Sequence, residues 1–210
     1  MTKKTSRKPA RKAPLQSRSK VTVDVILEAA IRILESEGSL AMTTSRVAEV
    51  AGVSVGTLYQ YFGNRDAILD ALQDRELERA TELLQSLLQG GMPLSDRDLA
   101  RRVVEGLMKL YQAAPALHRV LAVEGLRVSP KERVLAFDLR LVTAIRSFLS
   151  LTKAPIRRTN LDAAAFVIYQ SVRASMLAYL LERPAGVDER ALTEELIDLT
   201  VSYLLGPTDS

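Results

Sequence analysis

Apolar residues recur three and four positions apart along most of this chain, which is the spacing of a helix with one buried face. Gly, Pro and capping residues interrupt the pattern at intervals of a helix length. No stretch shows the alternation of a half-buried strand. The pattern predicts an all-α fold of about nine helices, over residues 23–37, 44–51, 55–62, 65–88, 96–113, 115–126, 130–151, 160–183 and 189–205.

Several of these helices begin at recognisable capping residues. Thr22 is predicted to cap the first helix, Asn64 the long helix and Asp188 the last. Ser95 precedes the helix that starts at residue 96. The run Ser129-Pro130-Lys131-Glu132 is a capping box with proline at the first helical position.

Residues 43–65 predict two short helices joined by a tight turn. Thr43 or Thr44 can cap the first helix, and Gly52 can end it because a residue without Cβ adopts a left-handed conformation at low cost. Ser54 can cap the second helix only two residues later. A connection that short sets the second helix steeply across the first, as in a helix-turn-helix.

The second of these helices has an unusual outward side. At about 100° per residue, Leu58 and Phe62 fall together on the buried side. The opposite side holds small, hydroxyl, amide and phenol groups where a surface helix usually carries Lys and Glu. Such groups suit close approach to base edges in the major groove of DNA. The residues on this side are Gly56, Thr57, Gln60 and Tyr61.

We expect two kinds of DNA contact from this region. Gln60 can pair with adenine, and Thr57 can offer a methyl or a hydroxyl group. Tyrosine hydroxyls and the helix N-terminus that begins at Thr43 favour phosphates. The candidate DNA-binding residues are Thr43, Thr44, Ser45, Val55, Gly56, Thr57, Tyr59, Gln60, Tyr61 and Arg65.

The chain resembles the TetR family of bacterial one-component regulators along this region. The resemblance lies in Thr43-Thr44, Val47-Ala48, Ala51-Gly52-Val53-Ser54, Gly56-Thr57-Leu58-Tyr59, Tyr61-Phe62 and Asn64-Arg65. It implies a helix-turn-helix domain at residues 21–66 and a regulatory and dimerisation domain at residues 67–210. It also implies a homodimer on a palindromic operator and, more often than activation, repression relieved by a small molecule. The alternative is a helical ligand carrier or interaction module that does not read DNA sequence.

The first 20 residues differ from the rest in composition. They contain eight Lys and Arg residues, no acid and almost no apolar residue, although the net charge of the whole chain is only +4. Such a composition predicts a disordered basic arm. The arm could add phosphate or minor-groove contacts, or it could serve only as a solubilising tail.

The last two predicted helices have apolar or small residues on more than one side. One such side can pack inside the subunit and another against a second subunit, although both could be satisfied within one chain. The resemblance favours the second subunit, since similar proteins dimerise through their last two long helices. The candidate interface residues are Ala164, Ile168, Ser171, Ser175, Ala178, Leu192, Leu196, Leu199 and Tyr203.

The resemblance also implies a ligand site among the middle helices. Polar residues on apolar helix faces are the candidates for its lining, with Met and Phe as apolar walls, although each could be ordinary core. Tyr169 and Arg173 stand four residues apart and can face one space, unless Arg173 pairs with a surface acid. The candidates are Met108, Tyr111, His118, Phe137, Phe148, Phe166, Tyr169, Arg173 and Met176.

The composition argues against other classes of protein. The chain has no cysteine and one histidine, and it lacks a phosphate-binding glycine loop and the motifs of zinc proteases and serine hydrolases. We therefore expect no enzyme activity, no cofactor and no metal site. No unbroken apolar run reaches the roughly 20 residues of a membrane helix, so a cytoplasmic protein is expected.

Overall fold

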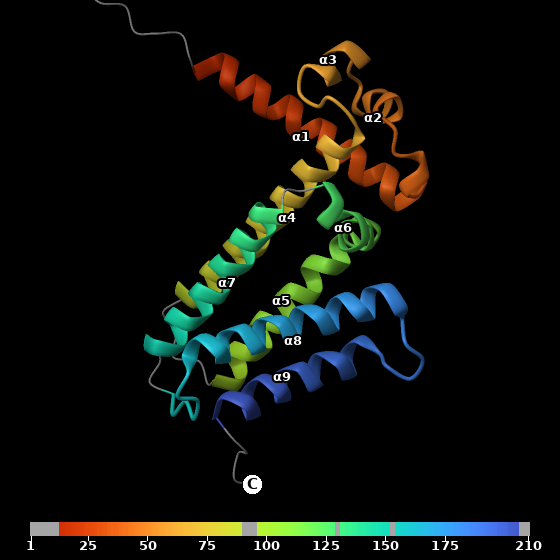
Figure 1. The fold of residues 1–210 in the computed structure, drawn as a ribbon. Coiled ribbons are helices and arrows are strands. Elements are labelled where there is room, and N and C mark those ends of the chain that lie inside the picture. Colours follow the sequence, from red (N-terminus) through yellow and green to blue (C-terminus); the bar gives the residue numbers. More distant parts are fainter. Residues whose placement is uncertain (1–12, 90–95, 129–130, 152–153, 206–210) are drawn as a thin grey trace, which may run out of the picture. The chain divides into compact units, whose positions relative to one another are not determined.

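The structure is a computed structural model that describes residues 13–89, 96–128, 131–151 and 154–205. Over these ranges it contains α-helices, one short 3₁₀ helix and no strand, so the predicted all-α class is confirmed (Figure 1). The helices are α1 (Ala13–Ser36), η1 (Ser39–Ala41), α2 (Thr44–Ala51), α3 (Val55–Tyr59), α4 (Arg65–Gln89), α5 (Asp96–Ala113), α6 (Pro115–Val128), α7 (Lys131–Leu151), α8 (Leu161–Glu182) and α9 (Glu189–Leu205).

Two compact units divide the chain. The N-terminal unit is Met1–Ile68 and the C-terminal unit is Leu69–Ser210. The division falls within α4, close to the predicted boundary after residue 66.

Side-chain caps form where α4, α8 and α9 begin, and those at Asn64 and Asp188 were predicted. The side-chain oxygens of Asn64, Asn160 and Asp188 accept hydrogen bonds from backbone N–H groups three residues ahead, at 2.8, 3.0 and 2.7 Å respectively. Each bond satisfies a donor that the first turn of a helix leaves without a partner. The predicted caps at Ser95 and at 129–130 lie outside the described residues.

The N-terminal unit is built on α1, which packs against α2, and α2 packs against α3. The inner side of α1 is buried through Ile26, Ala30 and Ile33. Val47 of α2 and Leu58 of α3 are fully buried as well. These residues form the core of the helix-turn-helix unit, in which Leu58 is buried as predicted.

The start of α1 corrects the sequence analysis. The helix begins at Ala13, so Thr22 does not cap it and residues 13–20 are helical rather than disordered. Pro14 stands in the first turn, where its missing N–H removes no helical bond, and the Leu, Gln, Arg and Lys residues that follow favour a helix. The sequence predicted disorder here because the segment is charged and polar, but several of these polar residues also have high helix propensity. Residues 1–12 of the predicted arm lie outside the described residues.

α3 is shorter than predicted, since it ends at Tyr59 rather than at Phe62. The turn continues beyond its end, because the backbone N–H groups of Tyr61 and Phe62 both donate to the Leu58 carbonyl at 2.9 Å. Phe62 is therefore still buried, as the wheel predicted.

In the C-terminal unit, α7 packs against α8 and α5 packs against α9. Glycine allows α4 to come close to two of its neighbours. A Cβ on Gly106 of α5 would lie 3.1 Å from Leu83, and one on Gly125 of α6 would lie 2.5 Å from Gln73 Oε1. The main apolar cluster joins α5, α8 and α9 through Ala100, Val104, Met108, Val172, Met176, Leu196, Ile197 and Val201.

By length and composition alone, α8 could cross a membrane, and it is the one helix in the described ranges that could. An 18-residue window of it has a mean hydropathy of 1.3, although Gln170 and Arg173 interrupt its apolar sequence. Seven of its residues are buried inside the C-terminal unit. That burial is also typical of a core helix in a water-soluble domain.

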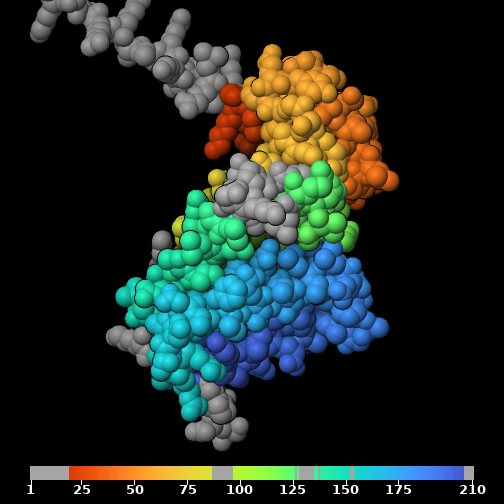
Figure 2. Space-filling view, viewed as in Figure 1, coloured from red at the N-terminus to blue at the C-terminus, as the bar shows by residue number. Residues whose placement is uncertain are grey.

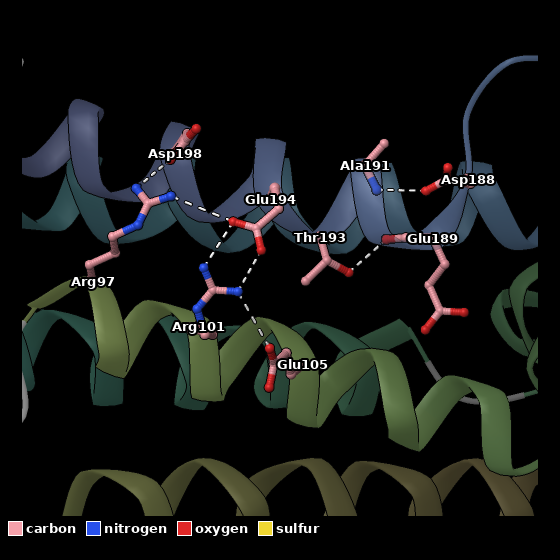
Figure 3. A network of polar contacts seen from close by, with 9 residues as sticks. All are labelled: Arg97, Arg101, Glu105, Asp188, Glu189, Ala191, Thr193, Glu194 and Asp198. Carbon is pink, nitrogen blue, oxygen red and sulfur yellow. Dashed lines mark hydrogen bonds and ion pairs between the residues drawn. The ribbon is translucent and has the colours of Figure 1, made fainter.

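A network of ion pairs joins α5 to α9 (Figure 3). Arg101 of α5 donates two hydrogen bonds to Glu194 of α9, at 2.5 and 2.9 Å. Arg97 lies 3.5 Å from the same carboxylate and also pairs with Asp198. The hydrogen bonds from Arg101 hold the pKa of Glu194 below its usual value. The two-bond geometry fixes the relative position of the two helices.

Glu194→Gln is expected to lower the free energy of unfolding at neutral pH. Because the folded-state pKa of Glu194 is lowered, its stabilisation is present above the unfolded-state pKa and is lost as the pH falls through the folded-state pKa. The difference between the two proteins should therefore shrink below the ordinary glutamate pKa of 4.5. Urea unfolding at several pH values measures it. Glu195→Gln on the exposed side of α9 is the control, and an equal loss there would contradict the role of the pair.

Candidate nucleic-acid interface and ligand cavity

The helix-turn-helix is fixed by local hydrogen bonds at both ends of its turn. Thr43 Oγ1 accepts from the Arg46 N–H at 3.2 Å, and Ser54 Oγ accepts from the Thr57 N–H at 3.0 Å. Gly52 adopts the left-handed conformation with φ 68° and donates back to the last turn of α2. The predicted caps and the predicted end of α2 are thus confirmed.

The outward side of α3 is open to solvent. Gly56 and Gln60 are exposed, and Val55 and Tyr59 are about half exposed. Thr57 and Tyr61 are partly buried, and the Thr57 hydroxyl lies 2.8 Å from Ser54 Oγ. No charged side chain stands between residues 54 and 61.

The N-terminus of α2 lies beside α3. Thr44 Oγ1 is 3.2 Å from the Tyr59 hydroxyl, so a predicted phosphate contact and the predicted reading helix share one surface. Thr43 and Ser45 are exposed there. The position of Arg65 is fixed by a hydrogen bond that its guanidinium donates to Ser39 Oγ at 2.8 Å, a contact that the sequence did not predict.

Arg46 is a residue of this region that the sequence analysis did not single out. It pairs with Glu37 through two hydrogen bonds, at 2.8 and 3.1 Å, and with Glu49 at 2.8 Å. The bond to Glu37 is the main cause that raises the pKa of Arg46. The pair ties α2 to the residue that follows α1. The two residues are nine positions apart and lie on either side of a helix end, so helical spacing does not predict their ion pair.

A cavity of about 250 Å³ lies inside the C-terminal unit, lined from every helix between α4 and α9. Its walls are mostly Leu, Val, Ala and Ile side chains. Six of the nine predicted ligand-binding residues line it: Tyr111, His118, Phe148, Tyr169, Arg173 and Met176.

The other three predicted cavity residues are not part of its described lining. Met108 is buried in the cluster of α5, α8 and α9 and does not line the cavity. The prediction for Phe166 is wrong, because its side chain is 54% exposed. Phe166 lies on the same face of α8 as Arg173, two turns nearer its N-terminus. Helical spacing shows which residues share a face, but not how much of that face the neighbouring helices cover. The side chain of Phe137 lies outside the described residues.

Glu76 of α4 is a cavity residue that the sequence analysis missed. It is buried, and its Oε1 accepts from Arg79 at 2.8 Å. Its Oε2 lies 3.6 Å from His118 Nε2, and both residues line the cavity. The sequence could have indicated its burial, because Glu76 stands four residues after Leu72 and therefore on the apolar face of α4.

Burial dominates the electrostatics of the polar cavity residues. It lowers the pKa of His118 to about 4, with Arg79 adding to the effect, so the imidazole is neutral at pH 7. Burial also raises the pKa of Tyr111, which meets the His118 ring edge-to-face with centroids 4.7 Å apart. The pKa of Tyr169 is raised by burial and by its 2.6 Å hydrogen bond to Asp138.

The predicted dimer interface needs correction. Ala164, Ile168 and Leu196 are buried inside the C-terminal unit and cannot meet a second subunit there. Ser171, Ser175, Leu192 and Tyr203 are partly buried, whereas Ala178 and Leu199 are exposed. The apolar residues exposed on the two helices are Phe166, Val167, Leu181 and Leu199. Both helices are apolar on several sides, so periodicity alone could not show which side faces inward.

Two other expectations concerned metal and enzyme chemistry. Within the described ranges, no group of three His, Asp or Glu residues is placed to hold a metal ion. The polar residues of the cavity include neither a cysteine nor a second histidine.

Comparison with known proteins agrees with this architecture. Residues 26–72 match the family of bacterial regulatory proteins of the tetR type, and residues 93–204 match the tetracyclin repressor-like C-terminal domain. The HTH-type transcriptional regulator EthR of Mycolicibacterium smegmatis is 27% identical over 176 residues, which are 80% of this chain and 79% of that protein. The nucleoid occlusion factor SlmA of Glaesserella parasuis is 28% identical over 149 residues, covering 69% and 72%.

A solved structure shows the same fold. The transcriptional regulator FadR from Bacillus subtilis, in complex with stearoyl-CoA, superposes with a TM-score of 0.66 at 18% identity, covering 86% of this chain and 98% of that one. The matched families are regulators and not enzymes. With a capped helix-turn-helix in one unit and a helical domain of this type in the other, the chain belongs to the TetR family of DNA-binding transcriptional regulators.

Proposed function

We propose that this regulator is a homodimeric repressor that binds a palindromic operator and leaves it when a small molecule fills the cavity. The observation that carries the proposal is the uncharged outward side of α3, where Gly56 and Gln60 are exposed. A helix whose outward side is small and can hydrogen-bond to bases can approach the base edges of the major groove closely.

The DNA contacts divide into two roles. Gln60 and Thr57 read bases, Gln60 through an amide that matches adenine and Thr57 through its methyl group. Tyr59 and the exposed N-terminus of α2 hold phosphates, supported by the contact between the Tyr59 hydroxyl and Thr44. Arg65 adds a cation that Ser39 keeps in place.

The uncovered side of α8 supports the homodimer. Figure 2 shows α8 running across the visible face of the C-terminal unit, and Phe166, Val167 and Leu181 are exposed along it. An apolar surface of this kind suits a protein partner. In a two-fold dimer the same surface meets its own copy, and the two helix-turn-helix units then read half-sites related by the dyad.

The cavity supports release by a ligand. It is lined mostly by apolar side chains of helices and holds a few polar groups, which is typical of a small-molecule site. A protein of the same fold, FadR, carries stearoyl-CoA in its structure. α4 contributes lining residues to the cavity and begins in the N-terminal unit, so a ligand that prefers one arrangement of α4 changes the affinity for DNA.

Titration of a duplex from the protein's own upstream region at two salt concentrations tests the DNA-binding proposal. Gln60→Ala and Thr57→Ala are expected to cost about 1–3 kcal/mol on the preferred sequence and to relax sequence preference. Tyr59→Phe should weaken binding to all duplexes alike, because phosphate contacts carry no sequence information. Gln112→Ala, at an exposed position of α5, is the matched control. A helical carrier without DNA reading would show no preference over random duplex.

Substitution on α8 tests the dimer. Phe166→Glu places a charge on the exposed apolar side and is expected to raise the dimer dissociation constant at least about tenfold, since unpaired charges are costly in interface cores. Analytical ultracentrifugation measures the dissociation constant. Val21→Glu in the N-terminal unit is an equally exposed apolar-to-acid control. Equal dimerisation of both variants would place the interface elsewhere.

A further inference from the structure

The polar end of the cavity contains two hydrogen-bond acceptors that face each other. His118 Nε2 and Glu76 Oε2 are 3.6 Å apart, and both residues are at least nine-tenths buried and line the cavity. Nε2 has no hydrogen-bond partner among the described residues.

The hydrogen bonding of His118 identifies which nitrogen carries its proton. The ring is hydrogen-bonded to the backbone of Leu110. Since Nε2 has no partner, this bond belongs to Nδ1, which must be the N–H donor to a carbonyl. In a neutral imidazole the other nitrogen is then an acceptor, so Nε2 presents a lone pair to the cavity.

The opposite atom presents lone pairs as well. Arg79 pairs with Glu76 at 2.8 Å, which favours the ionised carboxylate, and an ionised carboxylate only accepts hydrogen bonds. The two atoms therefore share no hydrogen with which to bond each other. A buried acceptor without a donor is costly, so a donor brought into this position is bound favourably.

The negative charge of Glu76 is offset by its ion pair with Arg79, so it does not by itself favour a cationic ligand. The positive charge of Arg79 opposes the protonation of His118, and it would oppose an ammonium group beside the ring for the same reason. Arg173 adds a second positive charge to the cavity lining. The rest of the lining is predominantly aliphatic, which suits an apolar ligand body.

We propose that the cavity binds a largely apolar, non-cationic ligand whose hydroxyl or amide N–H donates a hydrogen bond to His118 Nε2, with Glu76 Oε2 as a second acceptor. The inference rests on the proposed ligand site of the C-terminal unit and adds the chemistry of the group that the site selects.

A series of compounds with one decyl body tests this selection. Decanol and decanamide carry a donor, methyl decanoate has acceptors only, and decylammonium carries a charge. Isothermal titration calorimetry on the full chain is expected to show about tenfold tighter binding of the two donors than of methyl decanoate, with decylammonium no tighter than the ester. Equal affinity of decanol and the ester, tightest binding of decylammonium, or no binding of any compound would overturn the inference.

Two variants separate the hydrogen bond from the shape of the cavity. His118→Phe keeps an aromatic ring but removes the acceptor, so the preference for donors should disappear while methyl decanoate still binds. Glu76→Gln places an amide N–H beside Nε2 and should reduce the preference with His118 intact. Met108→Leu, buried nearby but outside the lining, is the control and should keep it. A full donor preference in His118→Phe would contradict the role of Nε2.

Operator binding measured with the same compounds distinguishes this inference from the proposed function. If the donors bind preferentially but saturated protein stays on the duplex, release by ligand is wrong and the ligand chemistry stands. If the compounds release the duplex with no preference for donors, release by ligand stands and the proposed chemistry is wrong.

Discussion

The packing of the C-terminal unit depends on helix α8, whose different sides contact different parts of that unit. It packs against α7, and it gives Val172 and Met176 to the cluster shared with α5 and α9. Tyr169 and Arg173 face the cavity. A helix that is apolar nearly all round must bury almost every side. The inward sides hold the unit together, and the side that stays exposed is the one for which we propose a second subunit.

Polar groups inside the C-terminal unit follow from the same constraint. Wherever apolar helices enclose a space, each buried polar atom needs a partner or carries a cost. Tyr169 meets this need by donating to Asp138, and Glu76 meets it through Arg79. His118 meets it at Nδ1 but not at Nε2 within the described residues. Among the buried side-chain acceptors that the structure describes, Nε2 is therefore the one whose missing donor indicates the chemistry of a ligand.

Much of the fold was predictable because its signals are local. Ser54, Asn64 and Asp188 cap helices as their positions predicted, since a cap depends on only three or four consecutive residues. The start of α1 was missed because its first residues read as a charged arm. Ile168 is buried inside the unit, which the sequence did not predict. A helix that is apolar on nearly all sides has no polar face to mark the side that faces solvent.

The candidate sites divide in the same way. Tyr169 and Arg173, four residues apart on one helix, do line the same cavity, because spacing along a helix fixes which side chains share a face. The approach of Glu76 in α4 to His118 in α6 brings together residues of two separate helices, and the pair of Arg46 with Glu37 spans a helix end. Contacts between separate elements depend on packing, which no local pattern records.

The shortness of α3 has a consequence for the evolution of the protein. A helix of residues Val55–Tyr59 cannot persist alone in water, so its conformation is imposed by Ser54, by Leu58 in the core and by the turn after Gly52. The exposed outward positions Gly56 and Gln60 contribute little to that scaffold, whereas the Thr57 hydroxyl contacts the Ser54 cap. Under the base-reading role that we propose for Gln60, mutation of this residue changes the preferred DNA sequence without first endangering the folding of the protein.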